Sequence, residues 1–128
     1  MIDVLIAEDE PGILDSLDFI LRRAGWTIDT VTDGDAALAG VRKLHPRGLV
    51  LDLMLPKRNG FEVLKELKAD PATRHIPVLI LTAKGQQHDR RVVEELGADG
   101  FVTKPYANED VINAVRRLLE SNPASGES

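Results

Sequence analysis

Short apolar runs alternate with longer amphipathic stretches along the whole chain. The five runs cover residues 4–7, 27–31, 48–51, 77–81 and 100–102. The first, third and fourth runs are continuously apolar, which is typical of strands covered on both faces in a parallel sheet. The second run is more polar, and we expect the second and fifth runs to be strands at the edges of the sheet, where one side can contact water. This alternation is the feature that most constrains the fold.

Helical periodicity fills the intervals between the runs. Apolar residues recur at helical spacing over residues 13–24, 37–44, 61–67, 92–96 and 111–119. Gly25 follows the first of these stretches as a helix-terminating glycine, and Asn108 is the predicted N-cap of the last. Five strands and five helices in strict alternation predict a (βα)5 chain, with helices on both faces of an open, doubly wound parallel sheet.

Length and composition exclude several classes of protein. The chain has 128 residues, which suits one domain over residues 1–120, with residues 121–128 as a flexible C-terminal tail or the start of a linker. No cysteine is present, which excludes disulfides, thiolate metal sites and a cysteine nucleophile. A net charge of −5 without a basic stripe argues against direct nucleic-acid binding. We find no membrane-spanning run and no signal peptide, and we expect a cytoplasmic protein.

Chemically active side chains follow four of the five predicted strands. Glu8 and Asp9 follow the first strand, Asp52 the third, Thr82 the fourth, and Lys104 the fifth. The carboxyl ends of parallel strands meet at one edge of a sheet, where ligands bind in open α/β folds. Each residue alone has an ordinary role as a helix-start acid, a cap or a turn residue. Their combination predicts a site with three carboxylates, a hydroxyl and an ammonium.

This set of side chains suits phosphoryl transfer. Three crowded carboxylates repel one another, so the cluster favours a hard divalent cation such as Mg²⁺ or Mn²⁺. A carboxylate can act as a nucleophile and form an aspartyl phosphate, while a metal ion and a lysine compensate the charge of the phosphoryl oxygens. The site therefore contains the parts for phosphoryl transfer onto Asp52. The three histidines, His45, His75 and His88, have no metal-ligand spacing and are predicted to be surface residues.

The sequence resembles the receiver domains of bacterial two-component response regulators from residue 2 to about residue 119. The resemblance is carried by the acidic pair Glu8-Asp9 and by the segment from Leu51-Asp52 through Pro56 to Asn59-Gly60. Further along the chain it is carried by Thr82-Ala83, by Gly97-Ala98-Asp99 and by Thr103-Lys104-Pro105. The order and spacing of these motifs together are specific to the family.

The resemblance implies a flavodoxin-like sheet of strand order 2-1-3-4-5. It implies that Asp52 accepts a phosphoryl group from a sensor histidine kinase or a histidine phosphotransfer protein. Asp9, Asp52 and the backbone carbonyl of Met54 would bind Mg²⁺, with Glu8 acting through water. Lys104 would contact the phosphoryl group. The peptide bond between Lys104 and Pro105 would be cis.

Switching and docking are implied in the same way. Thr82 would hydrogen-bond a phosphoryl oxygen, and Phe101 would turn inward as Thr82 moves. The kinase would dock on Glu10, Gly12, Ile13, Ser16, Pro105 and Tyr106. The output face would comprise the fourth helix, fifth strand and fifth helix, where a homodimer could form ion pairs through Arg90, Arg91, Glu94, Glu95, Arg116 and Arg117.

Three positions depart from the commonest pattern or vary within it. Glu8 replaces the more frequent aspartate, and its longer side chain still suits an indirect metal role. Met54 and Lys84 lie two residues after Asp52 and Thr82, where side chains tune the lifetime of the phosphoryl group. The segment 70–77 resembles receivers of stand-alone regulators, hybrid kinases and cyclic-dinucleotide enzymes. The sequence does not identify the stimulus or the output.

Other functions fit less well. A haloacid-dehalogenase-like phosphatase needs an acid/base two residues after its nucleophile, where this chain has Met54, so we expect self-phosphorylation and self-dephosphorylation without turnover of a separate substrate. A nucleotide-binding module needs a glycine-rich loop after the first strand, where this chain is acidic. A receiver-fold interaction module that works without phosphorylation stays open, although Asp52, Thr82 and Lys104 are all present.

Overall fold

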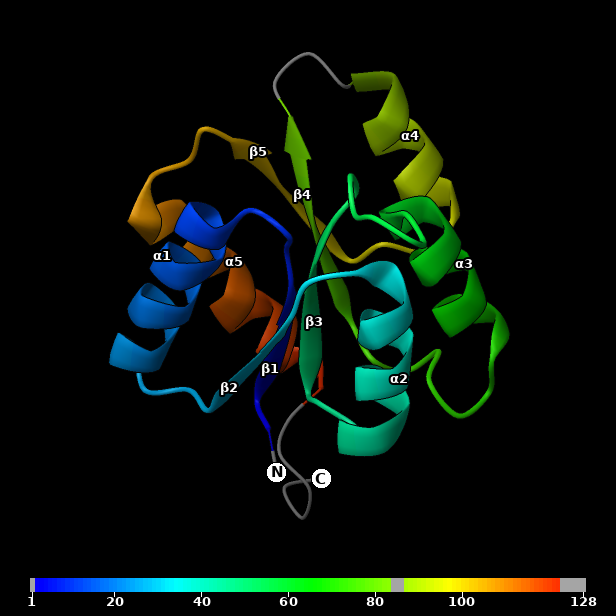
Figure 1. Cartoon of the computed structure of the whole chain (residues 1–128), viewed down its shortest axis with the longest axis horizontal. Coiled ribbons are helices and arrows are strands. Elements are labelled where there is room, and N and C mark those ends of the chain that lie inside the picture. The colour runs from blue at the N-terminus through cyan, green and yellow to red at the C-terminus, as the bar shows by residue number, and fades with distance from the viewer. Residues whose placement is uncertain (1, 84–86, 123–128) are drawn as a thin grey trace.

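The computed structural model describes residues 2–83 and 87–122, without the side chains of residues 87 and 88. Five parallel strands form one sheet in the order β2-β1-β3-β4-β5, which confirms the predicted fold (Figure 1). The strands are β1 (Val4–Ala7), β2 (Ile28–Val31), β3 (Gly48–Asp52), β4 (Val78–Ala83) and β5 (Gly100–Lys104). The helices are α1 (Pro11–Arg23), α2 (Gly34–Leu44), α3 (Gly60–Ala69), α4 (Gln87–Glu95) and α5 (Asn108–Glu120).

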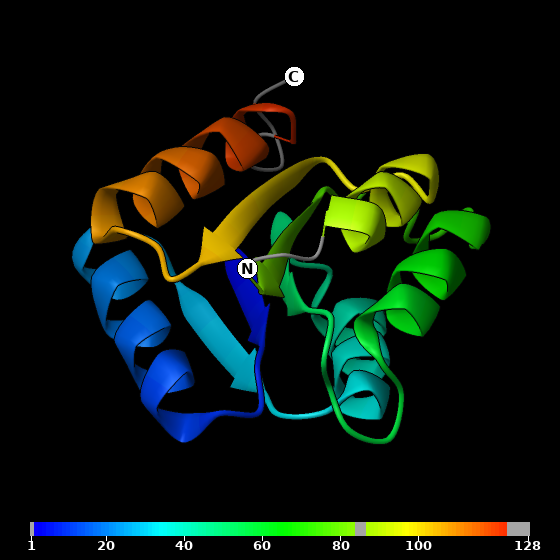
Figure 2. The same ribbon diagram turned by 90° about the horizontal axis from the view of Figure 1, so that it is seen from above.

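Helices cover both faces of the sheet. Helices α1 and α5 lie on one face, and α2, α3 and α4 lie on the other (Figure 2). Each face has its own apolar core, with Leu17, Ile20 and Val115 in the first and Leu38, Leu64 and Val93 in the second. Strands β1 and β3 are buried along their whole length, which explains why residues 4–7 and 48–51 are continuously apolar.

Side-chain caps mark the starts of two of the helices. Asp33 caps α2 by accepting a hydrogen bond from the Ala36 backbone N–H, and Asn59 forms a capping box with Glu62 at the start of α3. The prediction that Asn108 caps α5 was wrong, because Ala107 holds the extended N-cap conformation and Asn108 is the first helical residue. The acidic residues of the first turn suited either start, so composition did not fix the position.

The end of α5 is joined to the rest of the domain. The Asn122 side-chain amide donates to the Arg47 carbonyl at 2.9 Å, and Ser121 Oγ donates to the Leu118 carbonyl at 2.6 Å. These two residues belong to the predicted tail 121–128, whose other residues, 123–128, lie outside the described part of the chain. Within the described residues, none of the helices is long and apolar enough to cross a membrane.

Candidate functional site

Three carboxylates meet at the carboxyl edge of the sheet. Glu8 and Asp9 follow β1, and Asp52 is the last residue of the neighbouring strand β3. One carboxylate oxygen from each lies within 4.8 Å of the others. Glu8 and Asp52 are buried, whereas Asp9 is exposed. The cluster thus combines two desolvated carboxylates with one that faces solvent.

Lys104 supplies the positive charge beside this cluster. It is the last residue of β5, and its Nζ lies 3.1 Å from Glu8 Oε1 and 3.3 Å from Asp52 Oδ2. The Lys104–Pro105 peptide bond is cis. One ammonium is therefore shared between two buried carboxylates, while no other described lysine or arginine forms an ion pair with either of them.

The crowding of charges perturbs the ionisation of the site. Burial and the neighbouring Asp52 raise the pKa of Glu8 from 4.5 to about 7. Burial lowers the pKa of Lys104, but the hydrogen bond to Glu8 and the charges of Asp52 and Glu8 outweigh it, so that the net pKa is raised. Burial is also the first cause of the raised pKa of Tyr106. The site carries more negative charge than its single ammonium compensates.

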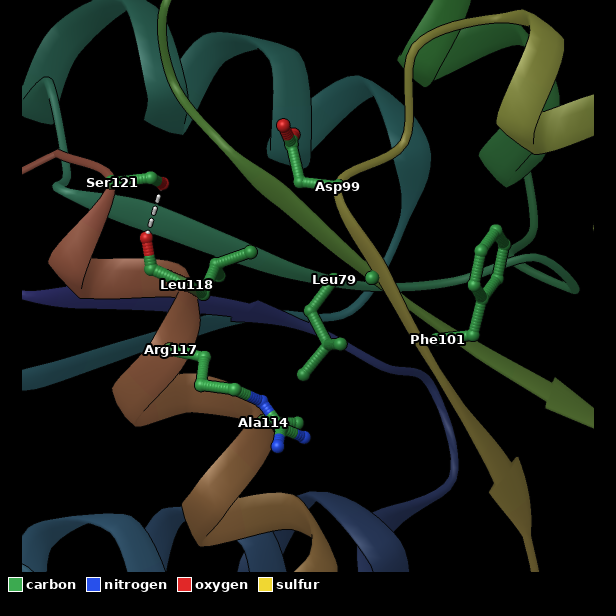
Figure 3. Close-up of a pocket in the computed structure, with 8 residues that line it drawn as sticks. Leu79, Asp99, Phe101, Ala114, Arg117, Leu118 and Ser121 are labelled. Carbon is green, nitrogen blue, oxygen red and sulfur yellow. Dashed lines mark hydrogen bonds between the residues drawn. The ribbon is translucent and has the colours of Figure 1, made fainter.

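Thr82 and Phe101 lie on the neighbouring strands β4 and β5. Thr82 is buried, and its hydroxyl donates to Thr103 Oγ1 at 3.4 Å. The Phe101 ring points away from α5 (Figure 3), and the Arg90 guanidinium lies 4.8 Å from its centre. Phe101 packs at the border of the core beneath α2, α3 and α4. The structure thus gives Thr82 and Phe101 separate partners.

Met54 lies on the loop that follows Asp52. Its backbone N–H donates to Asp52 Oδ1 at 3.3 Å, and the residue is 66% exposed. A cavity of about 310 Å³ beside it is lined by residues that include Asp9, Pro56 and Phe61. Met54 and Asp9 thus line the same cavity, and both are exposed to solvent. Lys84, the other predicted flanking residue, lies outside the described residues.

The predicted docking residues gather at the start of α1 and after β5. Glu10, Gly12, Ser16 and Pro105 are exposed. Ile13 and Tyr106 are half-buried and pack against the same apolar cluster, beneath α1 and α5. His45 and His75 are exposed, as predicted for surface residues, and the His88 side chain lies outside the described residues.

The predicted dimer face is grooved beside the edge strand β5. A cavity of about 290 Å³ lies between β5 and α5, and Arg117 reaches over it beside Ala114 (Figure 3). Some of the charged side chains on this face contact other side chains of the same chain. Arg90 lies 3.7 Å from Glu94, and the Arg116 guanidinium lies 5.8 Å from the centre of the Trp26 ring.

Sequence reasoning missed three contacts near the site. Thr103 is the hydrogen-bond partner of Thr82, and Arg58 binds Asp35 and Glu66 from the loop that carries Met54. The pairs Arg58–Asp35 and Thr82–Thr103 join residues 23 and 21 positions apart. No local periodicity indicates such pairs, so only the folded chain shows them.

Known proteins are related to this chain over most of its length. The sequence profile of the response regulator receiver domain matches residues 4–116. The sensory transduction protein RegX3 of Mycobacterium tuberculosis is 43% identical over 119 residues, which are 93% of this chain and 51% of that protein. The DNA-binding dual master transcriptional regulator RpaA of Synechocystis is 41% identical over 116 residues, which are 91% of this chain and 48% of that protein.

Solved structures agree in fold. The signal receiver domain of a signal transduction histidine kinase from Syntrophus aciditrophicus has a TM-score of 0.88 at 30% identity, over 100% of this chain and 97% of that one. The chain spans about half the length of RegX3 and RpaA.

Proposed function

The chain belongs to the response regulator receiver domain family of two-component systems, and from this membership we propose that Asp52 accepts a phosphoryl group. The donor is a phosphohistidine on a sensor histidine kinase or a histidine phosphotransfer protein, and the reaction takes place in the cytoplasm. The observation that carries the proposal is the grouping of Asp52 with Glu8, Asp9 and Lys104 at one edge of the sheet.

The donor set fits a hard divalent cation. The three carboxylates offer only oxygen ligands. Burial first, and the neighbouring Asp52 second, raise the pKa of Glu8, so a second positive charge beside Lys104 would favour the ionised cluster. Asp9, Asp52 and the Met54 carbonyl would hold Mg²⁺ or Mn²⁺, with Glu8 acting through water. The bound ion would neutralise charge on the phosphoryl oxygens.

Asp52 and Lys104 have different roles in phosphoryl transfer. A carboxylate oxygen of Asp52 attacks phosphorus, the P–N bond of the phosphohistidine breaks, and the imidazole leaves with the electron pair. The Lys104 ammonium moves from Asp52 to a phosphoryl oxygen, where it offsets the transferred charge. The later attack of water on the acyl phosphate returns Asp52 and releases inorganic phosphate.

Thr82 and Phe101 couple phosphorylation of Asp52 to a change at the output face. The Thr82 hydroxyl leaves Thr103 and donates to a phosphoryl oxygen, and Phe101 turns inward from its place beside Arg90. This rearranges α4, β5 and α5, the face on which we place the contact with an output or with a second copy. RpaA is a DNA-binding regulator about twice as long as this chain, so a DNA-binding output borne by a further domain is one form of this proposal.

Two alternatives have less support. A haloacid-dehalogenase-like phosphatase lacks its acid/base, because Met54 occupies that position. An interaction module without phosphorylation has no need of Asp52, Thr82 and Lys104 together at one edge of the sheet.

The direct test is intact-protein mass after incubation with Mg²⁺ and acetyl phosphate or phosphoramidate. We expect wild type to gain about 80 Da, the mass of one phosphoryl group, and Asp52→Asn to gain nothing. Absence of a gain in wild type, together with failure to bind beryllofluoride, would leave the interaction module as the better description. Turnover of excess phosphodonor by Asp52→Asn would favour a phosphatase with another nucleophile.

A further inference from the structure

The loop that carries Met54 is a compact turn. Residues 53–59 join β3 to α3, and the Gly60 backbone N–H closes the loop by donating to the Leu53 carbonyl at 2.9 Å. Lys57 within it has a φ of 67°, in the left-handed region that non-glycine residues seldom occupy. Neighbouring structure must therefore hold this conformation.

The turn between β2 and α2 presses against this loop at the backbone. The Gly34 N–H donates to the Pro56 carbonyl at 3.2 Å. A Cβ on Gly34 would lie 1.7 Å from the Arg58 carbonyl oxygen, so only glycine permits this approach. Lys57 Nζ lies 3.5 Å from Asp33 Oδ2 and adds a charged contact between the same two segments.

The Arg58 side chain ties the loop to two helices. Its Nε lies 3.0 Å from Asp35 Oδ1 on α2, and its Nη1 lies 2.6 Å from Glu66 Oε1 on α3. A guanidinium is suited to this role because its donors are fixed in a plane and can bind two carboxylates at once. Gly34, Asp35, Arg58 and Glu66 together form what we term the loop clamp.

We propose that the loop clamp sets the Mg²⁺ affinity of the acidic cluster by holding the Met54 carbonyl in place as a ligand. The inference rests on the proposed function, which assigns that carbonyl to the metal. Arg58 is a positioning residue here, since it acts through the backbone of the loop. A loop that is already ordered loses little conformational entropy on binding the ion, whereas a released loop must be ordered by the ion itself.

Amide chemical shifts of Asp9 and Met54 during a Mg²⁺ titration measure this affinity directly. Arg58→Ala removes both ion pairs, and the double variant Asp35→Asn with Glu66→Gln removes their charge without altering the loop. The matched control is Arg22→Ala, which removes an ion pair to Asp18 at 2.7 Å and a hydrogen bond to the Ile28 carbonyl, both away from the loop. Circular dichroism verifies that each variant is folded.

We expect Arg58→Ala and the double variant to raise the Mg²⁺ Kd by about threefold to tenfold, at or below the range for residues that touch metal ligands directly. Arg22→Ala should keep the wild-type Kd. Equal Kd values for wild type and Arg58→Ala would overturn the clamp while leaving the metal site in place. Failure of wild type itself to bind Mg²⁺ at tens of millimolar would instead overturn the metal assignment, and the clamp with it.

Discussion

Lys104 contacts Glu8 as closely as it contacts the proposed phosphoacceptor. Its Nζ lies 3.1 Å from Glu8 Oε1 and 3.3 Å from Asp52 Oδ2. Because both carboxylates are buried, they compete for one ammonium, and the pKa of Glu8 rises to about 7. Charge balance at the site therefore depends on pH when no metal ion is bound.

The first prediction concerns stability in EDTA as the pH rises. Between pH 4.5 and about pH 7, the folded protein keeps a proton on Glu8 that the unfolded chain releases. The free energy of unfolding should fall through this window, by an amount on the order of 2 kcal/mol. Lys104 stays charged throughout the window, since its pKa is raised from 10.5. Urea unfolding at pH 5.5 and pH 8 measures the change.

Glu8→Gln is the control for this pH effect. The amide does not ionise, so the decline in stability between these two pH values should become smaller. A decline of the same size in Glu8→Gln would mean that another group causes it.

The second prediction concerns the phosphoacceptor itself. In EDTA at pH 8, Asp52→Asn should not lower the Tm and should stabilise the fold by about 1 kcal/mol, because it removes the charge that competes with Glu8 for Lys104. Lys104→Met should have the opposite effect and destabilise by about 3 kcal/mol, because two buried carboxylates then lose their shared cation. Thermal unfolding compares the three proteins, and a large loss of Tm in Asp52→Asn would contradict the charge argument.

The third prediction concerns metal addition. Mg²⁺ at ten times its Kd should raise the free energy of unfolding of wild type by about 1.4 kcal/mol through mass action. Asp9→Asn should lose most of this gain, whereas its stability in EDTA should change little because Asp9 is exposed. The measurement is Tm against Mg²⁺ concentration, with Ca²⁺-free buffer and NaCl at equal ionic strength as the control. An equal gain in both proteins would argue against Asp9 as a ligand.

The fourth prediction concerns the start of α5. Ala107 is the N-cap in an extended conformation, with φ −82° and ψ 148°, and offers no side-chain acceptor. Ala107→Ser should stabilise the protein by about 1 kcal/mol, because a serine hydroxyl can accept from a backbone N–H of the first turn. Denaturant unfolding measures the gain, and Ala107→Val, which adds bulk without an acceptor, should give none.

Sequence patterns predicted the fold well because the pattern of apolar residues follows the pattern of burial. Strands β1 and β3 are covered on both faces, so nearly every position in them had to be apolar, and helical stripes placed the five helices between the strands. The start of α5 was off by one residue, because Asn108, Glu109 and Asp110 all suit a first turn and none of them fixes the cap.

The candidate site was predictable in part. The carboxyl ends of parallel strands must share an edge, so Glu8, Asp52, Thr82 and Lys104 could be grouped from their strand positions alone. Two findings depend on three-dimensional packing, and no spacing in the chain encodes them. Lys104 forms ion pairs with both Glu8 and Asp52, and Arg58 forms an ion pair with Asp35.

Arg47 brings the two ends of the described chain together. Its backbone N–H donates to the Ile2 carbonyl, its guanidinium binds Asp3 at 2.9 Å, and its carbonyl accepts from Asn122. This junction lies at the opposite end of the strands from the acidic cluster (Figure 1). Another polypeptide fused before Asp3 or after Asn122 would therefore lie away from the acidic cluster, and a circular permutant would need only a short bridge between these two residues.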